Sequence, residues 1–290
     1  MLLGLCLAGC TGSPGTPADA GTNPADAGTD PTDAGTNPSD AGTDPSDAGT
    51  NPPDAGTSGV RGFGLNDTGV TGCANASAAG LPCDSATAGT DGFPGQDGQA
   101  GRDVDAGSDA DGHAGFSFVK LDASGTALPD QSVPYATTPW ACLLDRVTGL
   151  TWEVRTTDGG LRDRRWRYTW FASTGLRGGA GKGVPNSGTC VDTSNCDTEK
   201  YLAAVNAAHL CGSSDWRLPT RSELLSLVDY GAPSVPLVDQ GFLPDASADS
   251  WWTATTDWFG NAWVVEFALG QSLATRPERP LRVRLVRGGF

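Results

Sequence analysis

The aromatic residues of this 290-residue chain are distributed very unevenly. All nine Trp and all four Tyr lie after residue 115, whereas residues 1–115 contain only two large aromatic side chains, Phe63 and Phe93. A segment so poor in large apolar side chains cannot bury enough surface to offset the conformational entropy lost on folding. The rest of the chain has the usual size of one domain. We therefore expect one folded domain at residues 116–290 and no fold that spans the whole chain.

The net charge follows the same division. The formal net charge is −15, and residues 1–115 contain 16 Asp, two Arg and no Glu. Nearly all of the negative charge therefore lies outside the domain. Because residues 116–290 are nearly neutral, net charge does not identify a partner for the domain, and we expect none among nucleic acids.

The start of the chain resembles a bacterial lipobox. Residues 1–10 are mainly apolar and end in Leu7-Ala8-Gly9-Cys10, a site at which a diacylglycerol is attached to the Cys and the upstream peptide is removed. The apolar run is far shorter than the ~20 residues of a membrane span. No Lys or Arg precedes it, so we expect the true start to lie upstream. We predict that a lipid on Cys10 holds the chain at a membrane, and Thr11 favours the outer membrane.

Residues 11–60 form a strict repeat. Asp-Ala-Gly-Thr begins at residues 19, 26, 33, 40, 47 and 54, with Pro between the copies. The repeat lacks the two apolar positions per heptad that a coiled coil needs, and its Pro residues prevent a helix. We expect a disordered linker, roughly 40 Å long as a flexible coil and up to ~150 Å when fully extended.

Residues 61–115 join this linker to the domain. Cys73 and Cys83 are ten residues apart among small residues, which favours a local disulfide. Gly recurs at every third position from residue 89 to 101, but so few triplets cannot form a collagen triple helix. The acids that follow do not match an EF-hand calcium loop, because Ala114 stands where the loop needs Glu.

The pattern of residues 116–290 is mixed. One helix is indicated from Asp197 to Cys211-Gly212, and a second one, reaching about Tyr230, by a capping box at Thr220 and Glu223. Strands are indicated at residues 165–170, 250–256, 262–268 and 281–285, and the middle two read as a hairpin. In the first and the last of these strands we expect the Arg side chains to face solvent. Because these elements do not alternate as βαβ units, we predict an α+β fold.

Several motifs of this part resemble the Lcl-type C-terminal domain, a domain of unknown function named for a collagen-like bacterial adhesin. The most specific is DWRLPT at residues 215–220, followed by EL at 223–224. The others are DRVTGLTWE (145–153), CDT (196–198), VNAA (205–208), LCG (210–212), WT (252–253), WVVEF (263–267) and VRLVRGG (283–289). FPGQD (93–97) and GRD (101–103) resemble a segment that precedes the domain in many members.

The resemblance implies a single disulfide-bonded domain similar to the C-type-lectin-like and formylglycine-generating-enzyme-like folds. It also implies that residues 61–115 partly contact the domain. Because the adhesin's domain implies glycan and host-matrix binding, we expect an adhesin-like surface lipoprotein that binds a polysaccharide or a protein partner. The alternative is a structural or assembly lipoprotein of the envelope without a small ligand.

Six Cys remain once Cys6 is removed with the signal and Cys10 carries a lipid. An even number in an exported protein favours disulfides over a metal site. Cys196 and Cys211 stand at the two ends of the expected helix, about 20 Å apart, and cannot pair. We predict the pairs Cys73–Cys83, Cys190–Cys196 and Cys142–Cys211. The alternative for the last two, Cys142–Cys196 with Cys190–Cys211, stays open.

Residues typical of catalysis are absent from the sequence pattern. The two His, His113 and His209, have no metal-ligand spacing, and no paired acid and base or activated nucleophile can be identified. We therefore predict no enzymatic activity, no cofactor and no metal.

Aromatic and basic side chains remain as candidates for a binding site. Trp258 falls at the turn of the expected hairpin, where exposure is expected. The Trp residues of the family motifs are expected in the core: Trp152, Trp216, Trp252 and Trp263. The only basic cluster spans residues 162–167, for which a solvated strand face is the simpler explanation. The candidate partner contacts are Trp258, Trp251, Arg164, Arg165 and Arg167.

Overall fold

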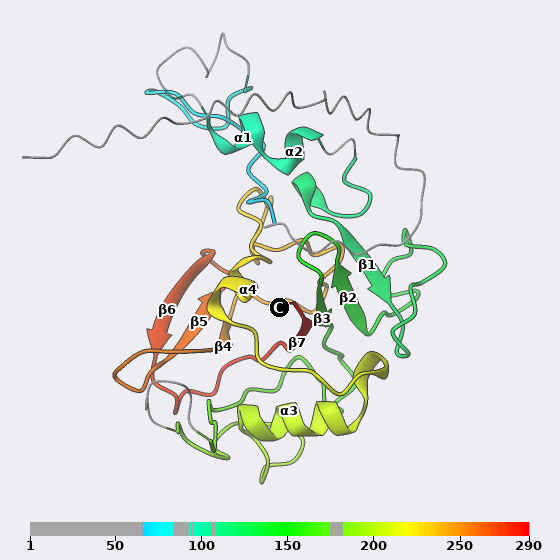
Figure 1. Ribbon diagram of the computed structural model, residues 1–290, viewed down its shortest axis with the longest axis vertical. Coiled ribbons are helices and arrows are strands. Elements are labelled where there is room, and N and C mark those ends of the chain that lie inside the picture. The colour runs from blue at the N-terminus through cyan, green and yellow to red at the C-terminus, as the bar shows by residue number, and fades with distance from the viewer. Residues whose placement is uncertain (1–65, 84–92, 94, 106–107, 175–181, 290) are drawn as a thin grey trace, which may run out of the picture. The chain divides into compact units, whose positions relative to one another are not determined.

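The computed structural model describes residues 66–83, 93, 95–105, 108–174 and 182–289 (Figure 1). The lipidation expected at Cys10 and the linker expected at residues 11–60 lie outside these residues. The described part combines short helices and short strands. This confirms the α+β class predicted from the sequence.

Among the described residues, seven strands form two antiparallel sheets. The first sheet has the order β1 (Phe118–Leu121), β2 (Cys142–Asp145), β3 (Leu150–Glu153) and β7 (Val286–Gly288). The second has the order β4 (Ser250–Thr256), β5 (Ala262–Glu266) and β6 (Gln271–Thr275). Ala262 pairs with Thr256 on one side and with Thr275 on the other, which fixes the register of the second sheet. The β4–β5 hairpin is the one expected from the sequence.

Helices α3 (Thr198–Ala207) and α4 (Arg221–Leu225) begin where the sequence indicates. The Asp197 side chain accepts a hydrogen bond from the N–H of Lys200, and Thr220 and Glu223 cap α4 reciprocally. Both helices end earlier than expected. Two residues after α3, His209 has a φ of 51°, a left-handed value that a right-handed helix cannot contain, and a single 3-10 turn follows at Leu210–Gly212.

The two sheets separate two hydrophobic cores, because successive residues of a strand point to opposite faces. On β4, Trp252 belongs to the core that α3 covers, whereas Trp251 belongs to the core that α4 covers. Val264 and Val265 of β5 divide in the same way. The expected core Trp residues are buried, except that Trp263 is only partly buried.

Two of the expected strands are irregular. Residues 165–170 and 281–285 make isolated bridges, such as Tyr168 with Leu281, and regular pairing begins only at β7. The expectation that Arg284 faces solvent is wrong, because this side chain is fully buried. Its Nη2 lies 2.6 Å from Oδ2 of Asp245, which lies far from it in the sequence, and this ion pair compensates the buried charge.

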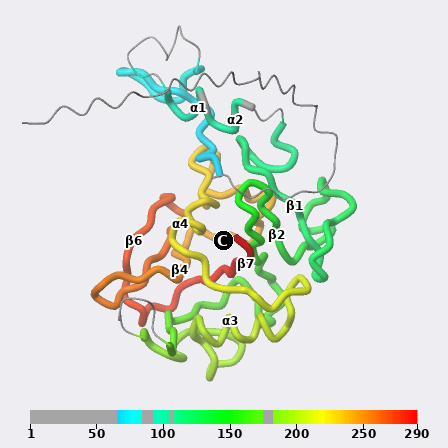
Figure 2. Tube along the Cα trace, in the orientation of Figure 1, coloured from blue at the N-terminus to red at the C-terminus, as the bar shows by residue number. Residues whose placement is uncertain are grey.

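The joining segment contacts the domain (Figure 2, cyan). It contains two helical turns, α1 (Asp97–Ala100) and α2 (Arg102–Asp105), followed by a 3-10 turn at His113–Gly115. Asn66 donates a hydrogen bond to Asp145 at 2.5 Å. His113 Nδ1 lies 2.9 Å from a carboxylate oxygen of Asp229.

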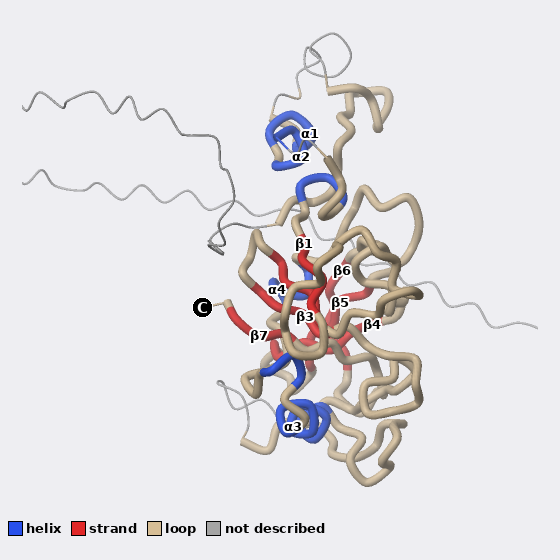
Figure 3. Tube along the Cα trace, turned by 90° about the vertical axis from the view of Figure 1, so that its right-hand side faces the viewer, coloured by secondary structure: helices blue, strands red, loops and turns tan. Residues whose placement is uncertain are grey.

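Long loops make up much of the domain (Figure 3, tan), and covalent bonds fix some of them. The structure contains the disulfides Cys73–Cys83, Cys142–Cys211 and Cys190–Cys196, the set favoured by the sequence. Cys142–Cys211 joins strand β2 to the turn after helix α3, and Cys190–Cys196 closes the loop before that helix.

Candidate functional site

A cavity of about 490 Å³ opens between α3, α4, the end of β7 and residues 170–174, and we name it the α3–α4 cavity. Its lining combines apolar walls with a few polar side chains. The lining residues are Trp170, Phe171, Ala172, Thr174, Thr198, Glu199, Leu202, Arg217, Leu218, Thr220, Glu223, Ala254, Gly288 and Gly289.

Two hydrogen-bonded side chains hold the walls of this cavity in place. The Thr198 hydroxyl accepts from the N–H of Phe171 at 3.0 Å and donates to the Phe171 carbonyl at 2.9 Å, which fastens this segment to α3. Arg217 donates to both carboxylate oxygens of Glu223, at 2.8 and 2.6 Å. It also donates to the carbonyl of Gly288 at 2.9 Å, so Arg217 connects α4 with the end of β7.

The polar groups of the cavity fall into two classes. Burial alone would raise the pKa of Glu223, but hydrogen bonds from Arg217 lower it below its ordinary value, so this internal pair is charged. By contrast, Glu199 uses only one carboxylate oxygen, Oε2, which accepts from the N–H of Ser173 at 2.5 Å. Its other oxygen and the Thr174 hydroxyl have no hydrogen-bond partner within the described residues. They are available to a ligand.

Comparison with known proteins defines the family. The family model for the Lcl C-terminal domain matches residues 141–287, which is half of the chain. The chain belongs to the Lcl C-terminal domain family. The resemblance recognised in the sequence motifs is thereby confirmed, and it relates the chain to an adhesin. Neither curated proteins nor solved structures gave a match.

Motifs of the Lcl C-terminal domain that are distant in the sequence meet at the α3–α4 cavity. DWRLPT contributes Arg217, Leu218 and Thr220, CDT contributes Thr198, and VRLVRGG contributes both of its glycines. These motifs identify the family in the sequence, but they do not reveal the cavity. The combination of charged and apolar residues within DWRLPT was the available signal, but the sequence does not show which segments it meets.

The turn between β4 and β5 carries two strongly exposed aromatic side chains. Trp258 is 87% exposed, as the sequence predicts, and Phe259 is 90% exposed. Oδ1 of Asp257 accepts hydrogen bonds from the N–H groups of Phe259 and Asn261, each at 2.9 Å. Oδ2 of Asp257 accepts from the Asn261 side chain at 2.8 Å. The turn is therefore held in one shape while its aromatic rings stay in solvent.

The candidate arginines lie away from this turn. Arg164 and Arg165 are exposed, and Arg165 lies 2.9 Å from Asp163. Arg167 lies 3.0 Å from Asp249, the residue just before β4, whereas Trp258 follows the other end of that seven-residue strand. A strand of this length separates the two positions by roughly 20 Å. The structure does not bring Trp258 and these arginines into one site.

Trp251 was assigned as a partner contact, and this assignment is wrong. The residue is only 1% exposed. The alternation of β4 points its ring into the core, where it lies 5.7 Å from the ring of Phe267 and 5.0 Å from the guanidinium of Arg284. Its hydrophobic surface stabilises the fold and is not available to a partner.

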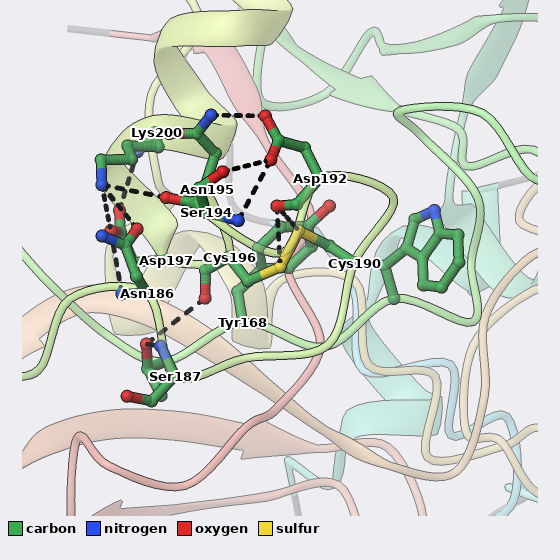
Figure 4. Close-up of a disulfide and its surroundings, with 12 residues drawn as sticks. Tyr168, Asn186, Ser187, Cys190, Asp192, Ser194, Asn195, Cys196, Asp197 and Lys200 are labelled. Atoms are coloured by element: carbon green, nitrogen blue, oxygen red, sulfur yellow. Dashed lines mark hydrogen bonds and ion pairs between the residues drawn. A yellow bond between two sulfur atoms is a disulfide. The ribbon is translucent and has the colours of Figure 1, made fainter.

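A second cavity, of about 280 Å³, lies beside the Cys190–Cys196 disulfide (Figure 4). The polar side chains around this disulfide bind one another. Asp192 accepts hydrogen bonds from Ser194 and Asn195, and Lys200 donates to Asn186 at 2.5 Å. These contacts order the loop.

The described residues contain no cluster of three or more His, Cys, Asp or Glu that could hold a metal ion. In the same part of the chain, no helix is long and apolar enough to cross a membrane.

Proposed function

We propose that the protein is a cell-surface lipoprotein whose Lcl C-terminal domain binds a polysaccharide in the α3–α4 cavity and has no enzymatic activity. The observation that carries this proposal is the composition of the cavity. Its apolar walls include Phe171, Leu202 and Leu218, and free polar groups of Thr174 and Glu199 lie beside them. A sugar ring has an apolar face and a rim of hydroxyl groups, and the cavity offers surfaces of both kinds.

The location of the protein is part of the proposal. We infer that a lipid on Cys10 anchors the chain in the outer membrane and that residues 11–60 separate the domain from the anchor. The lipobox at residues 7–10 and the Pro-containing repeat support this arrangement. We further propose that the domain shares the C-type-lectin-like and formylglycine-generating-enzyme-like fold. Its mixture of short antiparallel strands, few helices and disulfides supports that fold.

Changing the free polar groups of the cavity tests its role. The binding of the protein to a polysaccharide array should weaken about tenfold or more in the double variant Thr174→Val, Glu199→Gln, because each lost hydrogen bond to a sugar hydroxyl contributes about 1 kcal/mol. Gln keeps an oxygen that can accept from Ser173, so the fold should not change. A matched control makes the same substitutions at Thr193 and Glu266, outside the cavity. Equal binding by both double variants, or a silent array, would remove the support for this function.

A further inference from the structure

One end of the three-stranded sheet brings together two loops that are distant in the sequence. Ala262 follows the β4–β5 turn directly and pairs with Thr275, the last residue of β6. The turn at residues 257–261 and the segment at 276–280 are therefore neighbours, as Figure 1 shows below the arrowhead of β6. We name this region the aromatic end of the sheet.

Two exposed arginines lie in the aromatic end, and a third lies beside it on α4. Arg276 and Arg279 are exposed, and the Arg221 guanidinium lies 4.5 Å from the ring centroid of Trp263 on β5. None of these three arginines forms an ion pair with a carboxylate within the described residues. The acids in the two loops are Asp257 and Glu278. The two loops therefore hold two arginines and two carboxylates, and the carboxylate of Asp257 already binds within its own turn.

The hydrogen bonds of the turn indicate which kind of ligand it suits. Both carboxylate oxygens of Asp257 and the amide N–H group of Asn261 bind within the turn. The turn therefore has little left with which to recognise sugar hydroxyls. What remains is a pair of protruding rings, and the neighbouring loop carries two exposed arginines that form no ion pair within the described residues. Aromatic rings concentrate at the interface of a bilayer, and arginines there meet the phosphates of anionic lipids.

We propose that the aromatic end of the sheet is a membrane-docking surface, with Trp258 and Phe259 inserted at the interface of an anionic bilayer and Arg276 and Arg279 against its lipid phosphates. This goes beyond the proposed function, because it uses another surface and another partner. A linker of residues 11–60, roughly 40 Å long as a coil, would keep the domain close to the membrane that carries its anchor. Docking would then be favoured by the resulting high local concentration.

Sedimentation with lipid vesicles tests the proposal on the full chain carrying Cys10→Ser, so that no lipid is attached. The protein should bind vesicles of phosphatidylglycerol mixed with phosphatidylcholine more tightly than vesicles of phosphatidylcholine alone, and added salt should weaken binding. The double variant Trp258→Ala, Phe259→Ala should lose affinity by a factor on the order of 100, because two rings no longer leave water. Arg276→Gln with Arg279→Gln should weaken binding to the anionic vesicles roughly tenfold.

The other end of the same sheet supplies the control. Leu269, in the turn between β5 and β6, is 63% exposed, and Leu269→Ala should leave vesicle binding unchanged. An equal loss in Leu269→Ala, or normal binding by the Trp258, Phe259 variant, contradicts docking at the aromatic end. If the wild-type protein does not bind vesicles and the Trp258, Phe259 variant loses polysaccharide binding, this surface binds a polysaccharide instead. The cavity variants should bind vesicles normally, so the two proposals fail independently.

Discussion

Two groups of arginines in this domain have opposite surroundings. Arg284 is fully buried, and its guanidinium lies 2.6 Å from the carboxylate of Asp245. Arg276 and Arg279 are exposed, and neither forms an ion pair within the described residues. The same residue type thus stabilises the core in one region and remains available to a ligand in the other. The fold decides between these roles, because it determines whether a carboxylate comes within reach.

The buried group extends beyond one ion pair. The Arg155 guanidinium lies 4.7 Å from the ring centroid of Tyr201, whose hydroxyl donates a hydrogen bond to Glu153. Arg155 also donates to the carbonyl groups of Arg162 and Asp163, in the turn that follows it, and of Val283, which lies 128 residues away. Burial raises the pKa of Tyr201 well above its ordinary value, so this phenol remains protonated and acts as a donor. The buried guanidinium group of Arg155 therefore supplies hydrogen-bond donors to backbone carbonyl groups of the loops.

The largest effect that separates the two arginine groups should come from Arg284→Ala. It leaves the carboxylate of Asp245 buried without its cation, and we expect the free energy of unfolding to fall by about 3–5 kcal/mol. Urea unfolding followed by near-ultraviolet circular dichroism measures this change. Arg284→Met combined with Asp245→Leu removes both charges and should recover most of the loss. A loss below about 1 kcal/mol in the single variant would show that this ion pair does not stabilise the core.

An intermediate case is Arg165, which is exposed but pairs with a buried acid. Burial alone would raise the pKa of Asp163, yet hydrogen bonds from Arg165 and from backbone N–H groups hold it at about 2. Because the folded pKa lies below the ordinary value of about 3.9, the stabilisation is complete above that pH and is lost as the pH falls toward 2. The Arg165 side chain is 68% exposed and is screened by solvent, so we expect a smaller effect on stability than that of the buried Arg284–Asp245 pair.

Comparing the wild type with Asp163→Asn at several pH values tests this case. The difference between their urea midpoints should be constant from pH 7 to pH 5 and should shrink below pH 4. Subtracting the variant removes the contribution of the other acids that titrate in the same range. A difference that does not change between pH 5 and pH 2 would assign the role of Asp163 to packing and not to its charge.

Local patterns in the sequence predict those features of the fold that depend on near neighbours. The capping box at Thr220 and Glu223, the N-cap at Asp197 and the β4–β5 hairpin are each set within a few residues. The irregular segments at 165–170 and 281–285 were predicted as strands, because apolar alternation does not show whether a neighbouring strand exists to pair with. The error at Arg284 has the same origin, since Asp245 lies 39 residues away.

In the candidate site too, the features that depend on residues distant in the sequence could not be predicted. The exposure of Trp258 could be predicted because a hairpin turn reaches into solvent. Trp251 could not be placed correctly from composition, since it depends on which face of β4 meets a second core. The α3–α4 cavity was missed because its walls come from five separate segments, and only the folded chain shows that they meet.

The smallest effect on stability should come from the exposed arginines. Arg276→Gln combined with Arg279→Gln should change the free energy of unfolding by less than about 0.5 kcal/mol, because neither side chain forms an ion pair within the described residues. Urea unfolding checks this beside Arg284→Ala. The same double variant should weaken binding to anionic vesicles roughly tenfold, so stability and binding separate in one protein. A marked loss of stability would mean that these arginines hold the β6 segment in place, and the contrast between the two groups would then be one of degree only.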